Sequence, residues 1–262
     1  MEVKRFLIES ALLTHGLVSI SSTELADIWP QEYENIVWVD KGKIHIAGID
    51  EFLPFRAQAN RLCRIDSEHL PSALHEGASG ALTASGTMAV CKLMGLPLAV
   101  SCGLGGIGDI QAERLCPDLP ALRDLPVTLL GTCFKDMMDV PATMSWLRKH
   151  GVRVLGIDTD LCTGYLFSNA QVPLDGRLET YDLPAQAGRL LLLNPIPKEE
   201  RIAPLSLLET GIAAGKQAEA AGGYYHPAAS AAFDRWTKGA SSRMQLRSII
   251  ANAKLAQKLM CN

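Results

Sequence analysis

The sequence predicts a layered α/β protein with a largely parallel central sheet, built as a single domain over residues 1–262. Short apolar runs such as VTLLGT (127–132) alternate with helical segments, which is typical of strand–helix–strand units. Several runs are apolar at almost every position, as expected for strands that are buried on both faces of a parallel sheet. No linker rich in Pro, Gly or Ser divides the chain, and its length suffices for one full core.

The first elements follow from apolar patterning and capping residues. Residues 3–9 (VKRFLIE) predict a first strand. A helix is expected over 21–29, because Ser21 can cap it and Glu24 stands at the capping-box position. Residues 36–49 predict two strands around the DKGK turn.

The later elements alternate in the same way, and most of the strands end at a polar or glycine residue. In such folds ligand sites collect at the carboxyl ends of the strands, where Glu9, Gly103, Gly131 and Asn194 are expected. The predicted elements are a helix near 82–94, a strand at 96–102, a glycine cluster, strands at 127–132, 152–157 and 189–194, a helix at 142–151, and a mainly helical tail from about 204.

Composition excludes several classes of protein. The net charge is −3 and no basic run is present, which argues against nucleic acid as a partner. Seven cysteines without a CxxC pair favour a reducing compartment over a disulfide framework. No apolar run is long enough to span a bilayer, so no membrane partner is expected. These observations predict a cytoplasmic protein.

The stretch FLIESALL places one carboxylate, Glu9, within an apolar run. One interpretation puts Glu9 on the wet face of an amphipathic strand, near Lys4 and Arg5. The other makes Glu9 a proton donor in a dry site, where burial raises the pKa of the carboxyl group toward neutrality.

GLGGIG (103–108) fits the G-x-G-x-x-G pattern of dinucleotide-binding loops. The next predicted strand, 127–132, ends in Gly-Thr rather than in the acidic residue that such a site needs. A tight loop that lets backbone approach backbone explains the glycines better. A nest of N–H groups for an anion stays as an intermediate interpretation.

Six stretches in order resemble the pseudouridine-5′-phosphate glycosidase family, also called indigoidine synthase A-like. The similarity runs from about residue 6 to the C-terminus and implies a three-layer fold of that family. The stretches are ESALLTHG (9–16), LTASGTMAVCKLMGLPLAVSCGLGGIG (82–108), CPDL (116–119), LLGTCFKDMMD (129–139), LLLLNPIP (190–197) and SSRMQLRSIIANAKLA (241–256).

The resemblance implies reversible cleavage of the C–C glycosidic bond of pseudouridine 5′-phosphate, or of a related C-ribosyl phosphate, to uracil and ribose 5-phosphate. Lys135 matches the lysine that forms a Schiff base with the sugar. Glu9 matches the general acid that protonates the ring oxygen. Without the resemblance, Lys135 reads as an ordinary solvated lysine.

The resemblance also implies a set of substrate-binding residues. Arg64 aligns with a substrate-contacting lysine, and Ala84 with a position whose backbone touches substrate. Cys116, Pro117 and Asp118 fall on the family's S-x-D segment, where cysteine replaces serine. Gln245 replaces an asparagine of the terminal helix. Surface charge, helix-start packing and an ordinary polar helix residue are the alternatives for Arg64, Ala84 and Gln245.

The family binds manganese through an aspartate that Arg114 replaces here, with Glu113 as a tentative substitute ligand. A divalent metal is therefore expected by resemblance only, and so is a homotrimer. Two further hypotheses stay open: a Schiff-base enzyme acting on another sugar or sugar phosphate, and a non-catalytic homo-oligomer that keeps the fold.

Overall fold

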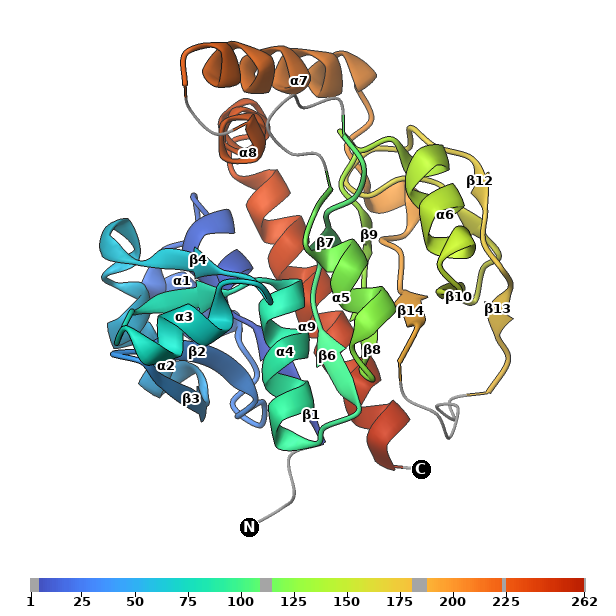
Figure 1. The fold of residues 1–262 in the computed structure, drawn as a ribbon. Helices are drawn as coiled ribbons and strands as arrows, with labels where there is room; N and C mark the ends of the chain where they lie inside the picture. The colour runs from blue at the N-terminus through green and yellow to red at the C-terminus, as the bar shows by residue number, and fades with distance from the viewer. Residues whose placement is uncertain (1–4, 109–114, 181–187, 223–224, 262) are drawn as a thin grey trace.

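One mixed, largely parallel sheet forms the centre of the computed structural model, which describes residues 5–108, 115–180, 188–222 and 225–261 (Figure 1). Neighbouring strands pair in parallel from β13 to β2, whereas β2 pairs antiparallel with β3 and β5. The predicted fold class is therefore confirmed. The strand order is β13 (Arg177–Leu178), β10 (Arg153–Ile157), β14 (Leu190–Leu193), β8 (Thr128–Gly131), β6 (Leu98–Val100), β1 (Phe6–Glu9), β2 (Ile36–Asp40), β5 (Gly80–Leu82) and β4 (Cys63–Ile65), with β3 (Lys43–Ala47) also on β2.

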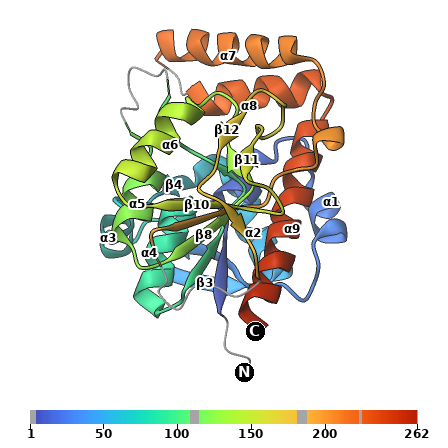
Figure 2. The ribbon, with the colours of Figure 1, turned by 90° about the vertical axis from the view of Figure 1, so that its right-hand side faces the viewer.

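Helices cover both faces of the sheet and its carboxyl edge (Figure 2). Helices α4 (Ala84–Met94), α5 (Asp118–Asp124) and α6 (Val140–Lys149) lie on one side, and α9 (Ala240–Cys261) lies on the other. Helices α7 (Leu205–Ala220) and α8 (Tyr225–Trp236) pack together across the end where the parallel strands finish (Figure 1). The smaller elements are a π-helix (Leu12–Gly16), α1 (Ser22–Ile28), α2 (Ile49–Arg56), η2 (Ala59–Arg61), α3 (Leu70–His75), β7 (Gly103–Leu104), β9 (Cys133–Phe134), β11 (Leu161–Cys162), β12 (Val172–Pro173) and η3 (Lys198–Glu200).

Local sequence signals explain most of these elements. The Ser21 hydroxyl accepts a hydrogen bond from the Glu24 N–H at 3.0 Å, as the capping pattern predicts. Lys41 and Gly42 both have positive φ angles, 49° and 72°, which suits the tight turn between β2 and β3. No helix of the described residues has the length and apolarity needed to cross a bilayer.

Two predicted boundaries are wrong. The helix expected from residue 82 begins at Ala84, because Leu82 ends strand β5 and Thr83 caps the helix with its side chain. The strand expected to reach residue 49 ends at Ala47, because Gly48 adopts an extended cap conformation and Ile49 begins α2. In both places an apolar run continues across a change of element, so periodicity alone does not mark the border.

Strands β1 and β5 meet end to end along one edge of β2. Strand β1 pairs in parallel with the first residues of β2, and Glu9 lies opposite Val37. Strand β5 pairs antiparallel with the next residues of β2, and Ala81 lies opposite Trp38. The two carboxyl ends therefore point at each other, and the Ser10 hydroxyl accepts a hydrogen bond from the Leu82 N–H at 2.9 Å.

Helix α9 closes the carboxyl ends of the central strands through one buried amide, Asn252. Its Nδ2 donates to the carbonyl of Ser101, after β6, at 2.8 Å and contacts the hydroxyl of Thr132, after β8, at 3.0 Å. Its Oδ1 accepts from the side chain of Asn194, after β14, at 2.9 Å. Buried polar groups at three strand ends are thus satisfied by one side chain.

The close approach of α4 to β4 leads to a stability prediction. A Cβ atom on Gly86 would lie 2.3 Å from the carbonyl oxygen of Ile65, which also accepts a hydrogen bond from the Thr83 N–H. Gly86→Ala is therefore expected to lower the free energy of unfolding by about 2 kcal/mol, measured by urea denaturation.

Gly48→Ala is the matched control, because its Cβ would meet only the Glu34 Cγ, at 3.7 Å. We expect a change below about 1 kcal/mol for this variant. Equal effects of the two substitutions would contradict the proposed steric cause.

Candidate functional site

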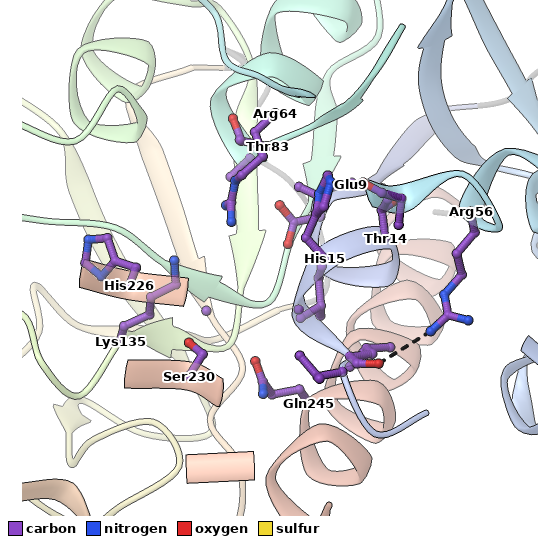
Figure 3. A pocket seen from close by; sticks show the side chains of 18 of the residues that line it. Glu9, Thr14, His15, Arg56, Arg64, Thr83, Lys135, His226, Ser230 and Gln245 are labelled. Carbon is purple, nitrogen blue, oxygen red and sulfur yellow. Dashed lines mark hydrogen bonds between the residues drawn. The ribbon is translucent and has the colours of Figure 1, made fainter. Parts of the chain in front are cut away.

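A cavity of about 650 Å³ opens at the carboxyl ends of the central strands (Figure 3). Its volume falls within the usual range for small-molecule sites. Side chains from the first strand and from the last helix reach it, so segments far apart in sequence meet there. The polar residues of its lining are Glu9, Thr14, His15, Arg56, Asn60, Arg64, Thr83, Asp118, Lys135, His226, Ser230 and Gln245.

The structure brings most of the predicted site residues to this one cavity. Two of them, Cys116 and Pro117, are not part of its lining, and Glu113 lies outside the described residues. The predicted residues that line the cavity are Glu9, Arg64, Ala84, Asp118, Lys135 and Gln245.

Glu9 is a buried carboxyl group at the end of β1, only 6% exposed. Burial raises its pKa from 4.5 to about 7, and the nearby charge of Asp118 acts in the same direction. The charges of Lys135 and Arg64 oppose this shift. Of the two interpretations of FLIESALL, the structure thus places Glu9 in the dry site, with its proton available near neutral pH.

Lys135 directly follows β9 and lines the cavity. The backbone N–H of Lys135 donates to the Leu104 carbonyl at 2.9 Å, which ties the lysine to the glycine loop. The next residue, Asp136, is buried and accepts hydrogen bonds from the N–H groups of residues 165–167 at 2.8–3.3 Å. The backbone on both sides of the lysine is therefore fixed. The two preceding residues, Cys133 and Phe134, are buried, and Lys135 itself is half-buried.

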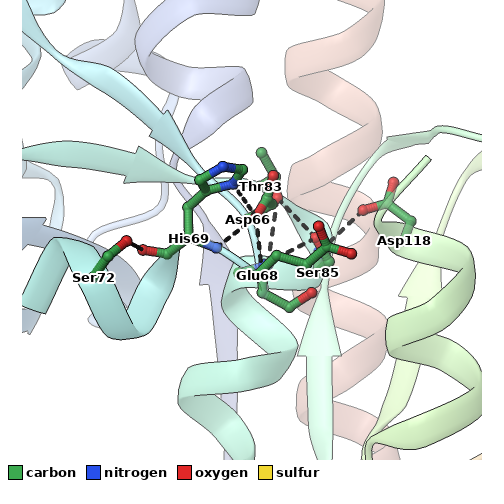
Figure 4. Close-up of polar contacts among 9 residues, drawn as sticks. Asp66, Glu68, His69, Ser72, Thr83, Ser85 and Asp118 are labelled. Atoms are coloured by element: carbon green, nitrogen blue, oxygen red, sulfur yellow. Dashed lines mark hydrogen bonds and ion pairs between the residues drawn. The ribbon is translucent and has the colours of Figure 1, made fainter. Parts of the chain in front are cut away.

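Asp118 joins two segments of the cavity wall, as Figure 4 shows in part. One carboxylate oxygen accepts the N–H of Ser85, in the first turn of α4, at 3.1 Å. The other oxygen accepts the N–H of Gly105, in the glycine loop, at 3.0 Å. Asp118 is 8% exposed, and these two bonds orient it beside Glu9.

Arg64 and the start of α4 form the cationic part of the cavity. Strand β4 carries Arg64, and β4 pairs with β5, whose end leads into Thr83 and α4. The side chain of Arg64 is exposed to solvent and makes no hydrogen bond or ion pair with the described residues. An unpaired guanidinium on the cavity wall is suited to hold an anion.

Cys116 supports the glycine loop instead of lining the cavity. A Cβ atom on Gly105 would lie 2.0 Å from the Cys116 Sγ, so glycine is required where the two segments touch. The Ile107 N–H donates to the Thr143 hydroxyl at 2.9 Å, and the Gly105 N–H is engaged by Asp118. These contacts agree with the tight-loop interpretation of GLGGIG, because the N–H groups at these two positions are occupied by protein.

Gln245 lies on α9 and is half-buried. Its Oε1 accepts a hydrogen bond from the Tyr165 hydroxyl at 3.3 Å, and its Nε2 donates to the Ser241 carbonyl at 3.3 Å. Gln245 thus brings the last helix to the cavity beside Lys135 (Figure 3).

Sequence reasoning missed Arg56 and the residues of α8, which line the cavity from different sides (Figure 3). Arg56 donates to the carbonyls of Leu13 at 2.7 Å and Ile20 at 2.6 Å, which holds the segment after Glu9 in place. His226 and Ser230 of α8 face the cavity opposite β1 (Figure 3). No motif marks these positions, because each depends on how separate helices pack.

His15 holds two neighbouring carbonyl groups in place. Its Nε2 lies 3.2 Å from the carbonyls of both Ala59 and Leu62, so this nitrogen carries a proton. Burial and the charge of Arg64 lower the pKa of His15, which keeps the ring neutral.

The described residues do not form a metal site. No group of three or more His, Cys, Asp or Glu side chains gathers among them, and both Asp118 oxygens already accept N–H bonds. Glu113 and Arg114 lie outside the described residues, so the manganese expectation stays a prediction.

Comparison with known proteins gives matches over the whole chain. The family model described as "Indigoidine synthase A like protein" matches residues 7–262. A pseudouridine-5′-phosphate glycosidase of Methylobacterium nodulans is 26% identical over 96% of this chain and 81% of its own length. The Petrotoga mobilis protein of the same name is 24% identical over 96% of this chain and 89% of its own.

Two solved structures share the fold. An indigoidine synthase A-like protein of Thermotoga maritima has a TM-score of 0.74 at 18% identity and covers 97% of this chain and 91% of its own. The prealnumycin C-glycosynthase AlnA, in complex with ribulose 5-phosphate, has a TM-score of 0.75 at 21% identity with the same coverage.

The raised pKa of Glu9 predicts how stability depends on pH. Between its unfolded value of 4.5 and its folded value of about 7, the folded protein holds a proton that the unfolded chain has released. Stability contributed by protonated Glu9 is therefore lost as the pH rises through this window. Glu9→Gln removes the titration, so its stability relative to the parent is expected to rise by about 2–3 kcal/mol between about pH 5 and pH 8.

Urea unfolding of both proteins at the two pH values measures this change. A difference between variant and parent that is the same at both pH values would show that Glu9 is not buried as a neutral acid.

Proposed function

Since the chain belongs to the indigoidine synthase A-like family, we propose that it is a C-glycosidase of pseudouridine 5′-phosphate or a related C-ribosyl phosphate. The products are uracil, or a related base, and ribose 5-phosphate, and the reaction is reversible. The observation that carries the proposal is the convergence of Glu9 and Lys135 on one cavity (Figure 3). The names of the relatives, and the ribulose 5-phosphate bound to the AlnA neighbour, support it.

Glu9 acts as the acid that opens the ribose ring. The carboxyl group donates its proton to the ring oxygen as the bond between this oxygen and the anomeric carbon breaks. A pKa of about 7 suits this step, because an acid works best when it is protonated near the working pH yet gives its proton up readily. Because Glu9 is neutral, the empty site does not bury an unpaired negative charge, which would cost free energy.

Lys135 acts as the nucleophile. Its amine bonds to the anomeric carbon, and the nitrogen lone pair then forms a C=N bond as the C–C bond to the base breaks. The electron pair of the broken bond stays with the base carbon, which takes up a proton. Water hydrolyses the imine, which releases ribose 5-phosphate and restores the amine.

Arg64 is proposed to hold the phosphate. Asp118 keeps the first turn of α4 and the glycine loop at a fixed spacing around the sugar. Gln245 and the backbone at Ala84 complete the sugar site. Cys116 supports the loop from behind, and Pro117 precedes Asp118 at the start of α5.

A different sugar or sugar phosphate is the second candidate substrate. The observation that favours it is the loss of the S-x-D hydroxyl, since Cys116 stands there and lies outside the cavity lining. The homotrimer of the family is likewise carried over to this chain as a proposal.

Reductive trapping tests the proposed nucleophile. Incubation with ribose 5-phosphate and borohydride is expected to add the mass of the sugar phosphate less one oxygen atom to Lys135. Lys135→Arg keeps the charge but cannot form the imine, so the adduct is expected to disappear. Intact-mass and peptide mass spectrometry measure the site.

The matched control is Lys92→Arg, on the exposed face of α4, which should trap like the parent. An adduct on Lys135 only with unphosphorylated sugars favours the second candidate. Absence of any adduct with all sugars tested, with no change in thermal stability, supports a non-catalytic oligomer instead.

The pH dependence of cleavage tests the proposed acid. Because Glu9 must carry its proton, kcat/KM for cleavage is expected to fall as the pH rises above about 7. Glu9→Gln should lower kcat/KM by about 10²–10⁴-fold and remove this decline. A decline at the same pH in the Glu9→Gln variant would assign the titration to another group.

A further inference from the structure

Two thiols meet just outside the cavity, in a place that the proposed reaction does not use. Cys133 lies in β9, two residues before Lys135, and Cys162 lies in β11. Their Sγ atoms are 3.2 Å apart, and both residues are almost fully buried as free thiols. A disulfide needs about 2.05 Å between the sulfurs, so a movement of about 1 Å would join them.

A buried cation stands beside this pair. Arg201 is 8% exposed, and its guanidinium donates to the carbonyl of Ile196 at 2.7 and 2.9 Å and to the hydroxyl of Thr163 at 2.9 Å. Its charge acts on both thiols. A fixed positive charge favours thiolate, which is the reactive form of cysteine.

The two thiols are unequal. The hydrogen bond between the two sulfurs raises the pKa of Cys133 and lowers the pKa of Cys162. Burial raises the pKa of both thiols, whereas a bond from the Gly164 backbone and the charge of Arg201 lower the pKa of Cys162. The Arg201 guanidinium is also fixed to Thr163, the residue after Cys162, at 2.9 Å. Cys162 is therefore the nucleophile of the pair, and Cys133 is the thiol that follows it.

Cys162 lies in a small sheet of its own. Strands β11 and β12 form a separate two-stranded sheet with two residue pairs, Leu161 with Pro173 and Cys162 with Val172. A sheet of this size opens at a lower free energy than the central sheet, which lets a small oxidant reach the sulfur.

We propose that Cys133 and Cys162 form an oxidation site that hydrogen peroxide closes into a disulfide. The Cys162 thiolate attacks one peroxide oxygen, the O–O bond breaks, and the leaving oxygen takes up protons as water. The Cys133 sulfur then displaces hydroxide from the sulfenic acid, and this hydroxide leaves as a second water with the Cys133 proton. Two thiols and one peroxide thus give one disulfide and two waters.

The disulfide also changes the proposed active site, an effect that rests on the proposed function. Lys135 follows Cys133 by two residues, and the N–H groups that hold Asp136 follow Cys162 by three to five residues. Drawing the sulfurs together shifts both segments. A displacement of about 1 Å at a catalytic group can cost on the order of 100-fold in rate.

Peptide mapping of the full chain after treatment with hydrogen peroxide tests the proposal. A Cys133–Cys162 disulfide that a thiol reductant reverses is expected. Trapping on Lys135, done here with cyanoborohydride because borohydride itself reduces disulfides, is expected to fall at least about tenfold until the thiol reductant is added. Cys162→Ser should lose the disulfide and keep its trapping yield after peroxide. Cys91→Ser, a buried thiol on α4, is the matched control and should behave like the parent.

Failure of the two proposals can be told apart. Peroxide treatment that leaves Cys133 and Cys162 as separate thiols, with the other cysteines oxidised, would overturn the oxidation site. A disulfide in a protein that never traps a sugar would confirm the site and overturn only the proposed function. A disulfide that leaves trapping unchanged would overturn the link to Lys135.

Discussion

The end-to-end meeting of β1 and β5 along β2 is the constraint on which the rest of the site depends. It directs two strand ends at one point, so the residues that follow them, Ser10 and Thr83, must turn away in different directions. One turn becomes the π-helix that lines the cavity, and the other becomes the capped start of α4. Glu9 remains at the junction itself, where neighbouring strands exclude water. Strand pairing thus keeps water away from the Glu9 carboxyl group.

Charge balance follows from this geometry. Two carboxyl groups, Glu9 and Asp118, share the cavity with Lys135 and Arg64. Asp118 accepts hydrogen bonds from two backbone N–H groups, whereas burial is the main influence on the Glu9 carboxyl group. Asp118 therefore positions the cavity wall, and Glu9 is the carboxyl group that can supply a proton. A negatively charged substrate would pair with the cations and leave Glu9 without their opposing influence. Binding itself would then make Glu9 a better-protonated acid.

The sequence predicts most strands of the central sheet, the α1 cap and the turn after Asp40, because each is encoded within a few neighbouring residues. It does not predict the short strands β4, β5 and β13. The grouping of Glu9, Lys135, Asp118 and Gln245 could be expected only through the family resemblance, since they stand on separate elements. Cys116 shows that a role inferred from the family resemblance does not always apply. It stands at the serine position of the S-x-D segment, but its side chain packs behind Gly105. Arg56 and α8 could not be foreseen, because long-range packing brings them to the cavity.

Asn252 has a consequence for how the protein is made. It joins the ends of three central strands from the last helix of the described chain, and Arg5 near the first strand donates to the Met260 carbonyl at 2.7 Å. During synthesis the ribosome releases β1 long before α9 emerges. Contacts of such wide sequence separation slow the final assembly. The nascent polypeptide therefore carries uncovered apolar strands until α9 has emerged, and chaperones have most to protect during this interval.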